Sequence, residues 1–225
     1  MHILVTNDDG VYAPGLLALA VELRKIGKVS IVAPDHNWSS SGHVKTLRRP
    51  LRVKDAILED GSHAYACDGA PSDCVAIAVL GLLPEPIEMV VSGINPNANL
   101  GYDVTYSGTV TAAMEAVIWN LPGIAVSLDA PEFHTGRLDY DAAAQVGRRI
   151  AERVWEKGLP NNTLLNVNVP YSEMGEIKGF RVTRQGLRVY HDRLLDEKTP
   201  ADSPTTGLAV MLLRAFQRRA LILER

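Results

Sequence analysis

The sequence predicts an α/β fold in which a mostly parallel sheet is covered by helices on both faces, giving three layers. Short apolar runs of strand length alternate along the chain with longer segments of helical periodicity, which is the pattern of βαβ units. The strand candidates are nearly continuous apolar runs, as expected of strands that are buried on both faces. With 225 residues, 46% of them hydrophobic and 22% charged, the chain can build one sizeable core.

The predicted elements follow one another in a regular order. After a first strand, Pro14 and Gly15 mark a break in the chain, and Leu16, Leu19 and Leu23 then recur at helical spacing. A polar Asp-Gly turn between residues 51–53 and 62–66 predicts an antiparallel hairpin excursion. The five core strands are expected at residues 3–5, 29–33, 87–93, 123–128 and 163–169, and the four helices at 16–23, 72–82, 109–119 and 140–155.

Composition and short motifs exclude several classes of protein. The chain has 23 Lys and Arg against 26 Asp and Glu, a net charge of −3, which argues against binding to a nucleic acid polymer. It lacks a G-x-G-x-x-G after the first strand, a signal-peptide start and an apolar run of the roughly 20 residues that span a membrane. Cys67 and Cys74 lack metal-pair or redox-pair spacing and are expected to be buried or incidental thiols. We therefore expect a soluble, cytoplasmic protein.

Two adjacent carboxylates follow the first predicted strand, in the stretch ILVTNDDG. In a parallel α/β sheet the ligand crevice lies outside the carboxyl ends of the strands, so Asp8 and Asp9 lie where a ligand is expected. One interpretation of the pair is structural, because Asp is a common turn and helix-capping residue. The other is a cation site, since two unpaired carboxylates in a partly desolvated pocket repel each other. Oxygen ligands favour Mg²⁺, Mn²⁺ or Ca²⁺, and the six histidines are scattered.

Other polar stretches follow later strands and are expected to reach the same crevice. Residues 107–109 precede a helix, where they fit either a helix N-cap or a phosphate site built from hydroxyls and free N–H groups. Asn95, Asn97 and Asn99 fit either loop turns or ligands of a metal and a phosphate. Residues 39–41, three serines, fit either a flexible loop or hydroxyl donors.

Taken together, these motifs resemble one family. TNDDG, VAPDHNWSSSGH, DGAPSDCV, VSGIN and NLGYDVTYSGTVTAAMEA, with LLNVNVP and VTRQG later, occur in the order of the SurE family, survival-protein phosphatases that act as 5′-nucleotidases. The likeness covers residues 1–195. It implies a Rossmann-like α/β core and metal-dependent removal of phosphate from nucleoside 5′-monophosphates. It also implies a homodimer or tetramer, an inference that the unusual end of the chain leaves open.

The resemblance further implies a set of site residues. One divalent ion per subunit, Mg²⁺ or Mn²⁺ with Ca²⁺ possible in crystals, would be held by Asp8, Asp9, Ser39 and Asn95. The phosphate pocket would map to Asn99, Ser107, Gly108 and Thr109. One departure lies beside a ligand: the family usually has a basic residue before that serine, and this chain has Trp38.

Two questions of mechanism and class stay open at this point. Attack by metal-activated water, with Asp9 or Asp8 as the proton acceptor, is the expected reaction, and a phospho-aspartate intermediate is the alternative. A catalytically weak nucleotide-binding protein of the same fold is the alternative function. A receiver-type signalling module is disfavoured, because such a module needs an Asp after the third core strand, where this chain has Ser92, Gly93, Ile94 and Asn95.

The end of the chain departs from the family pattern. Family members continue with an aromatic Tyr-Tyr-Trp-Ile-Gly-Gly stretch, whereas residues 196–225 form a Leu- and Arg-rich tail. One interpretation is a genuine amphipathic tail. The other is a shifted reading frame, because residues 204–216 can be encoded so that a displacement by one base reads the family stretch. We therefore expect a phosphatase-like domain at 1–195 and an atypical, possibly frame-shifted tail at 196–225, which the gene's own codons test.

Overall fold

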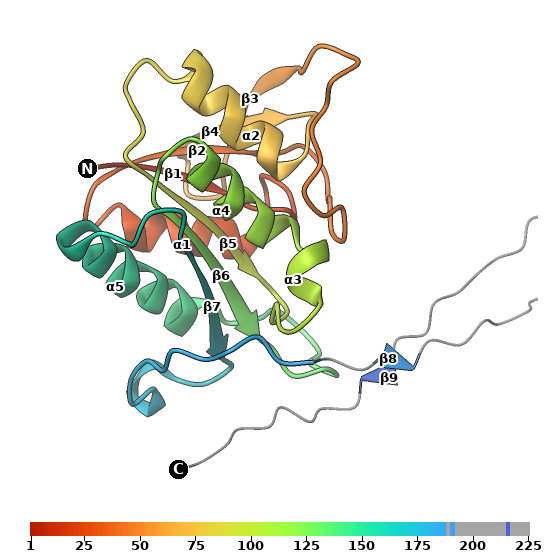
Figure 1. Cartoon of the computed structure of the whole chain (residues 1–225), viewed down its shortest axis with the longest axis vertical. Coiled ribbons are helices and arrows are strands. Elements are labelled where there is room, and N and C mark those ends of the chain that lie inside the picture. Colours follow the sequence, from red (N-terminus) through yellow and green to blue (C-terminus); the bar gives the residue numbers. More distant parts are fainter. Residues whose placement is uncertain (188–189, 192–214, 217–225) are drawn as a thin grey trace, which may run out of the picture. The chain divides into compact units, whose positions relative to one another are not determined.

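A seven-stranded sheet forms the middle of the computed structural model, which describes residues 1–187, 190–191 and 215–216 (Figure 1). Its strands are β1 His2–Thr6, β2 Lys28–Pro34, β3 Val53–Ile57, β4 His63–Cys67, β5 Met89–Asn95, β6 Gly123–Asp129 and β7 Leu164–Pro170. The spatial order is β3-β4-β2-β1-β5-β6-β7, and only the β3–β4 pair is antiparallel. The predicted α/β class, the mostly parallel sheet and the antiparallel hairpin are confirmed.

Helices cover both faces of this sheet. They are α1 Pro14–Leu23, α2 Pro71–Ile77, α3 Asp103–Tyr106, α4 Gly108–Ile118 and α5 Asp141–Lys157, with a π-helical turn at Ala78–Leu82 and a 3₁₀ turn at Met174–Glu176. Helices α1 and α5 pack together on one face, and α2 and α4 pack together on the other (Figure 1). The three predicted layers are therefore present.

Two elements differ from the prediction. The expected helix at 72–82 ends as an α-helix at Ile77 and continues as the π turn, where Gly81 has a φ of +121°, outside the helical region. Helix α3 was not predicted, because a single turn inside a polar loop carries no apolar periodicity. The short helix matters for the site, since it leads directly into α4.

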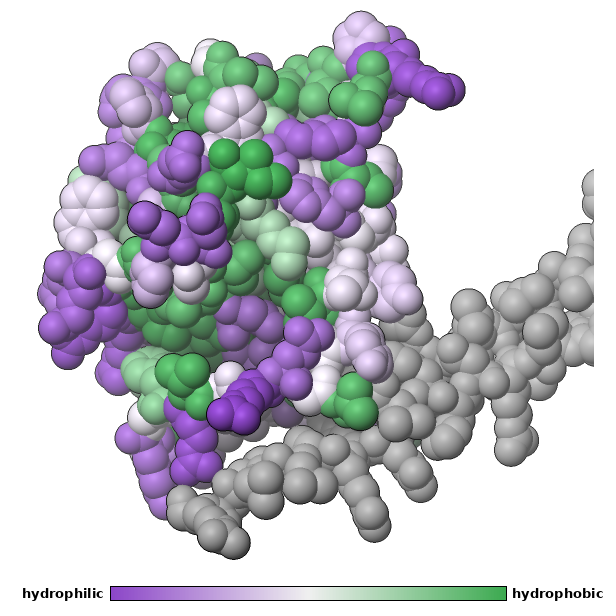
Figure 2. Space-filling view, in the orientation of Figure 1, coloured by the Kyte–Doolittle hydropathy of each residue, from purple (hydrophilic) through white to green (hydrophobic). Residues whose placement is uncertain are grey.

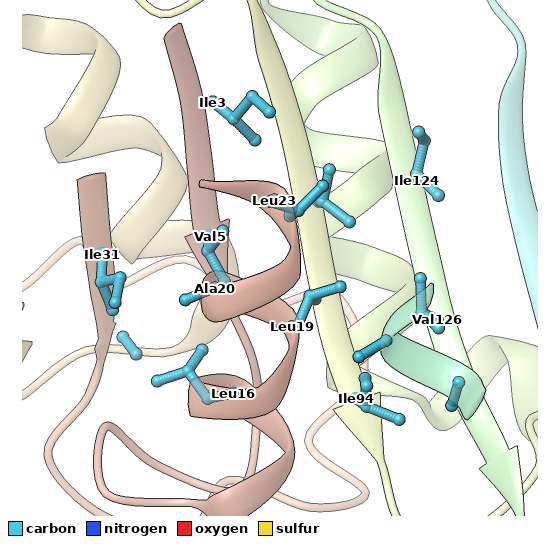
Figure 3. Close-up of a cluster of buried hydrophobic side chains, with 14 of the residues drawn as sticks. Ile3, Val5, Leu16, Leu19, Ala20, Leu23, Ile31, Ile94, Ile124 and Val126 are labelled. Atoms are coloured by element: carbon cyan, nitrogen blue, oxygen red, sulfur yellow. The ribbon is translucent and has the colours of Figure 1, made fainter. Parts of the chain in front are cut away.

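The side chains of the central strand divide between two cores. Ile3 and Val5 pack with α1 and α5, and Figure 3 shows both side chains together with Leu19 and Leu23 of α1. Leu4, between them, packs with α2 and α4 on the opposite face. Because successive side chains of a strand point to opposite faces, a strand buried on both sides must be apolar at every position. All five residues of β1 are buried.

Trimming one of these side chains tests the packing. We expect Ile3→Val to lower the free energy of unfolding by about 1 kcal/mol, because one buried methyl group is lost and the site relaxes only in part. Urea unfolding monitored by circular dichroism measures this change. An unchanged midpoint would contradict the burial of Ile3 against α1 and α5.

Charged side chains, rather than a long apolar face, mark the surface of helix α5. Helix α5 carries the ion pairs Arg148–Glu152 and Arg153–Glu156, and Arg148 also pairs with Glu22 of α1. The left edge of Figure 2, where α5 lies, is largely hydrophilic. Among the described residues, no helix has the length and apolar character needed to cross a membrane. Cys67 and Cys74 are buried free thiols, as predicted.

The chain divides into a compact unit, Met1–Thr183, and a second unit, Arg184–Arg225. In the second unit the structure describes residues 184–187 and a short antiparallel pair formed by β8 Tyr190–His191 and β9 Ala215–Phe216. The predicted boundary at residue 195, and all of the tail 196–225 except Ala215–Phe216, lie outside the described residues. The domain boundary and the shifted reading frame therefore remain predictions.

Candidate metal and phosphate site

The acidic pair lies at the point where the sheet reverses its order. The chain builds outward from β1 through β2 to β4 on one side, and from β5 through β6 to β7 on the other. Crevices form where neighbouring parallel strands send their connections in opposite directions, here between β1 and β5. Asp8 and Asp9 follow β1, and Asn95 ends β5, where the register against β6 shifts. The topology alone therefore brings these three residues to one edge.

A tight turn fixes the backbone that carries the pair. The Asn7 side chain donates to the carbonyl of Gly10 at 3.0 Å and accepts from the Gly10 N–H at 3.2 Å. Gly10 has a φ of +108°, a backbone conformation that residues other than glycine rarely adopt. Asn7 is fully buried, so the turn is a rigid part of the core rather than a surface loop.

Asp8 is held by the beginning of helix α4. Its Oδ1 accepts a hydrogen bond from the Thr109 hydroxyl at 2.5 Å, and its Cβ would lie only 2.6 Å from a Cβ added to Gly108. Burial raises the pKa of Asp8, while hydrogen bonds from Thr109 and the backbone of Gly108 act in the opposite direction. The first turn of α4 thus already engages one carboxylate of the pair.

Asp9 is the uncompensated member. Its Oδ2 is buried and has no hydrogen-bond partner among the described residues. Burial first, and the charge of Asp8 second, raise its pKa to about 7. The half-buried Tyr140, at the start of α5, is affected by the same carboxylate: burial first, and the charge of Asp9 second, raise the pKa of Tyr140 to about 12. A buried carboxylate oxygen without a donor is what a hard cation would satisfy, so the donor set fits a divalent ion.

The other two proposed metal ligands lie on different segments. Asn95 is half-buried, and its Nδ2 donates to the carbonyl of Asn97, which leaves its amide oxygen as the atom suited to a cation. Ser39 is exposed on the loop after β2, where its N–H donates to the Asn37 side chain at 2.7 Å. That loop is tied to the acidic pair, because the Trp38 N–H donates to the Asp8 carbonyl at 2.7 Å.

Asn99 is more firmly held than its loop position predicted. Its N–H donates to Asn168 Oδ1 at 2.8 Å, and its carbonyl accepts from the side chains of Asn166 and Asn168 at 2.9 and 3.2 Å. Its Nδ2 donates to the Ser127 hydroxyl at 2.8 Å. An amide NH₂ has two hydrogens, so one remains for a ligand oxygen. In the sequence, Asn166 and Asn168 lie within the motif LLNVNVP, but nothing in that pattern predicts their contact with Asn99.

Ser107 is the N-cap of α4. Its hydroxyl accepts from the Val110 N–H at 3.1 Å, so the capping interpretation of this residue is confirmed. A cap and a phosphate site are compatible, because the same helix end presents N–H groups and a positive dipole. With Ser107, Gly108 and Thr109 all buried, the helix start faces Asp8 rather than open solvent.

The cluster is unusual in its chemistry. Within the described part of the chain, no group of three or more His, Cys, Asp or Glu side chains is placed to hold a metal ion. The proposed ligands are instead two carboxylates, a hydroxyl and an amide, which lie on three separate segments of the chain. Such a set is harder to recognise than a cluster of His or Cys, because only the topology of the sheet brings its members together. The fold and site together define an α/β protein whose candidate cation and phosphate site lies at the switch point of a doubly wound sheet.

Comparison with known proteins agrees with this class. The family model of the survival protein SurE matches residues 3–192. A 5′-nucleotidase SurE from Chloroflexus aggregans is 50% identical over 204 residues, 91% of this chain and 80% of the relative, and one from Herpetosiphon aurantiacus is 49% identical over 91% and 79%. The crystal structure of the SurE protein from Aquifex aeolicus matches with a TM-score of 0.77 at 39% identity, covering 89% of this chain and 78% of that one. The chain belongs to the SurE family.

Proposed function

We propose that this protein is a metal-dependent 5′-nucleotidase, which hydrolyses nucleoside 5′-monophosphates to a nucleoside and phosphate. The observation that carries the proposal is the acidic pair next to the first turn of α4, in which one buried carboxylate oxygen has no hydrogen-bond partner among the residues that the structure describes. The relatives from Chloroflexus aggregans and Herpetosiphon aurantiacus are both named 5′-nucleotidase SurE, which supports the same activity here.

The residues divide into two proposed roles. Asp8, Asp9, Ser39 and Asn95 would hold one divalent ion, Mg²⁺ or Mn²⁺. Asn99, Ser107, Gly108 and Thr109 would bind the phosphate. When bound, the ion would neutralise phosphate charge and lower the pKa of the attacking water. The start of α4 and the remaining amide hydrogen of Asn99 would donate hydrogen bonds to the phosphate oxygens as negative charge develops there.

The two carboxylates are not equivalent as proton acceptors. Asp8 already accepts from the Thr109 hydroxyl, and hydrogen bonds stabilise its charged form. Asp9 Oδ2 accepts no hydrogen bond among the described residues, and a carboxylate has two oxygens, so one can bind the ion while the other stays available to the proton of the attacking water. We therefore infer that Asp9 accepts the proton of the attacking water. A phospho-aspartate on either residue is the alternative, which oxygen-18 water and trapping of labelled phosphate would separate.

Metal removal tests the proposal. We expect EDTA-treated protein to release no phosphate from AMP or GMP, and Mn²⁺ or Mg²⁺ to restore turnover by at least about 100-fold, because the acidic pair alone would repel the substrate dianion. Phosphate release is measured colorimetrically, with circular dichroism as the control for folding. Turnover that survives EDTA would remove the metal from the account. Folded, metal-loaded protein without turnover would favour the nucleotide-binding alternative.

Two further inferences accompany the function. The bacterial relatives and the two buried, unbridged cysteines support a cytoplasmic location. Family membership supports assembly into a homodimer or tetramer, and a nucleoside monophosphate as the substrate. From the net charge of −3 and the lack of a long apolar run in the sequence, we expect neither a nucleic acid polymer nor a membrane as a partner. Size-exclusion chromatography with light scattering measures the molar mass in solution and therefore the number of subunits.

A further inference from the structure

A buried glutamate lies on α4, outside the set of proposed ligands. Glu115 is 1% exposed, and its carboxylate accepts from Lys45 Nζ at 2.5 Å and from the Trp119 indole at 2.8 Å, and pairs with His43 Nε2 at 3.0 Å. Burial acts to raise the pKa of Glu115, but these hydrogen bonds and the Lys45 charge outweigh it, so the pKa is lowered. Because a buried charge that loses its partners is strongly destabilised, these contacts hold His43 and Lys45 against α4.

A second buried carboxylate, Asp73, binds Thr46, which directly follows the segment that Glu115 contacts. Asp73, at the start of α2, is 2% exposed. Its two oxygens accept from the Thr46 N–H at 3.0 Å and from the Thr46 hydroxyl at 2.7 Å, and it also accepts from the Ala70 N–H at 3.1 Å. Next to it, the Ser72 hydroxyl donates to the Val44 carbonyl. Residues 42–46, which we call the anchored segment, are therefore held by α4 at one place and by α2 at another.

The anchored segment begins where the Ser39 loop ends. The Thr111 hydroxyl of α4 donates to the Gly42 carbonyl at 3.1 Å, and the Gly42 N–H donates to the Tyr106 carbonyl at 2.9 Å. At its other end, the loop is tied to the acidic pair through the bond from the Trp38 N–H to the Asp8 carbonyl. The three serines at 39–41, between Trp38 and Gly42, therefore lie in a stretch that is fixed at both ends.

One helix therefore serves both halves of the site. The first turn of α4 holds Asp8 through Thr109, and its later turns hold the anchored segment through Thr111 and Glu115. Any displacement of the anchored segment relative to α4 would move the Ser39 loop relative to Asp8. We propose that Glu115 and Asp73 are positioning residues, which fix the Ser39 loop against the acidic pair by holding residues 42–46 onto α4 and α2. The proposal rests on the proposed function only in assigning Ser39 to the metal.

The test compares local opening of the loop with metal binding. Glu115→Gln removes the buried charge, and the loop-side double variant His43→Ala and Thr46→Val weakens both anchors without changing either helix. Glu85→Gln is the control, because Glu85 forms an exposed pair with Lys28 away from the loop. Trypsin cleavage after Lys45, measured on metal-free protein by mass spectrometry, reports the open population of the anchored segment. Titration calorimetry with Mn²⁺ reports the metal site.

We expect both anchor variants to be cleaved after Lys45 about tenfold faster than the wild type and the control, since charge-assisted bonds that keep the segment closed are lost. We expect Mn²⁺ to bind them about tenfold more weakly, the scale found for residues that orient metal ligands indirectly, with the KM for AMP at saturating Mn²⁺ changed less than about threefold.

The outcomes separate the two proposals. Cleavage and Mn²⁺ affinity equal to those of the wild type in both anchor variants would overturn the positioning role. Faster cleavage with unchanged Mn²⁺ affinity would also overturn it, because the anchors would then be structural only. A wild type that binds no Mn²⁺ would instead overturn the proposed function, and with it the link from the anchors to the metal.

Discussion

Asp9→Asn is expected to lower kcat/KM for AMP about 1000-fold at saturating Mn²⁺, with the fold intact. The variant keeps the size of the side chain but removes the charge that would bind the ion and accept the proton, and the loss corresponds to roughly 4 kcal/mol of transition-state stabilisation. Phosphate release under steady-state conditions measures it. Asp55→Asn is the control, because Asp55 forms only an exposed pair with His63, and its activity should stay within about twofold of the wild type.

The same variant should change how stability depends on pH in the metal-free protein. The pKa of Asp9 is about 7 in the folded state and near 3.8 when unfolded, so between these values the folded state holds a proton that the unfolded state has released. The stability of the wild type should therefore fall as pH rises through this window, and remain lowered above pH 7. Asp9→Asn lacks this loss. Urea unfolding in EDTA at about pH 5 and about pH 8 compares the two. A parallel pH dependence in both proteins would contradict the buried, uncompensated charge.

Gly108→Ala is expected to lower kcat about 100-fold while leaving the protein folded. A Cβ at this position would lie 2.6 Å from the Cβ of Asp8, closer than real Cβ atoms approach, and 3.0 Å from its Oδ2, which is a tight contact. Either Asp8 or the first turn of α4 must therefore shift, and a displacement of about 1 Å in a catalytic group is enough for a loss of this size. The measurement is phosphate release at saturating AMP and Mn²⁺.

The matched control is Gly175→Ala. Gly175 has no heavy atom within 4 Å of an added Cβ, so the same chemical change should leave kcat within about twofold of the wild type. Equal activities in the two alanine variants would show that Asp8 and the start of α4 have room to separate. They would then not act as the single unit that the proposed mechanism requires.

Much of this account was available in the sequence because the signals are local or periodic. The apolar runs around Ile3 and Val90 mark buried strands directly, and parallel strands have a known edge for ligands. That rule alone placed Asp8, Asp9 and Asn95 together. The hairpin was equally readable, because its Asp-Gly turn lies between two short strands.

Other features depend on contacts between residues far apart in the chain. Asn99 lies 69 residues from Asn168, and Thr109 lies 101 residues from the Asp8 carboxylate it contacts. No periodicity or spacing encodes such pairs. The unequal environments of Asp8 and Asp9 arise from the same long-range packing, so which carboxylate has a free oxygen could be learned only from the structure. The anchoring of His43 and Thr46 was hidden for the same reason.

The central claim is that one divalent ion binds between the segments that carry the acidic pair, Ser39 and Asn95. Anomalous diffraction at the manganese edge, from crystals of the whole chain soaked in Mn²⁺, tests it most directly. The account predicts one anomalous peak per subunit, about 2.0 to 2.5 Å from carboxylate oxygens of Asp8 and Asp9. A well-ordered structure in which these two carboxylates have no manganese peak beside them, or in which the peak lies on other residues, would contradict it.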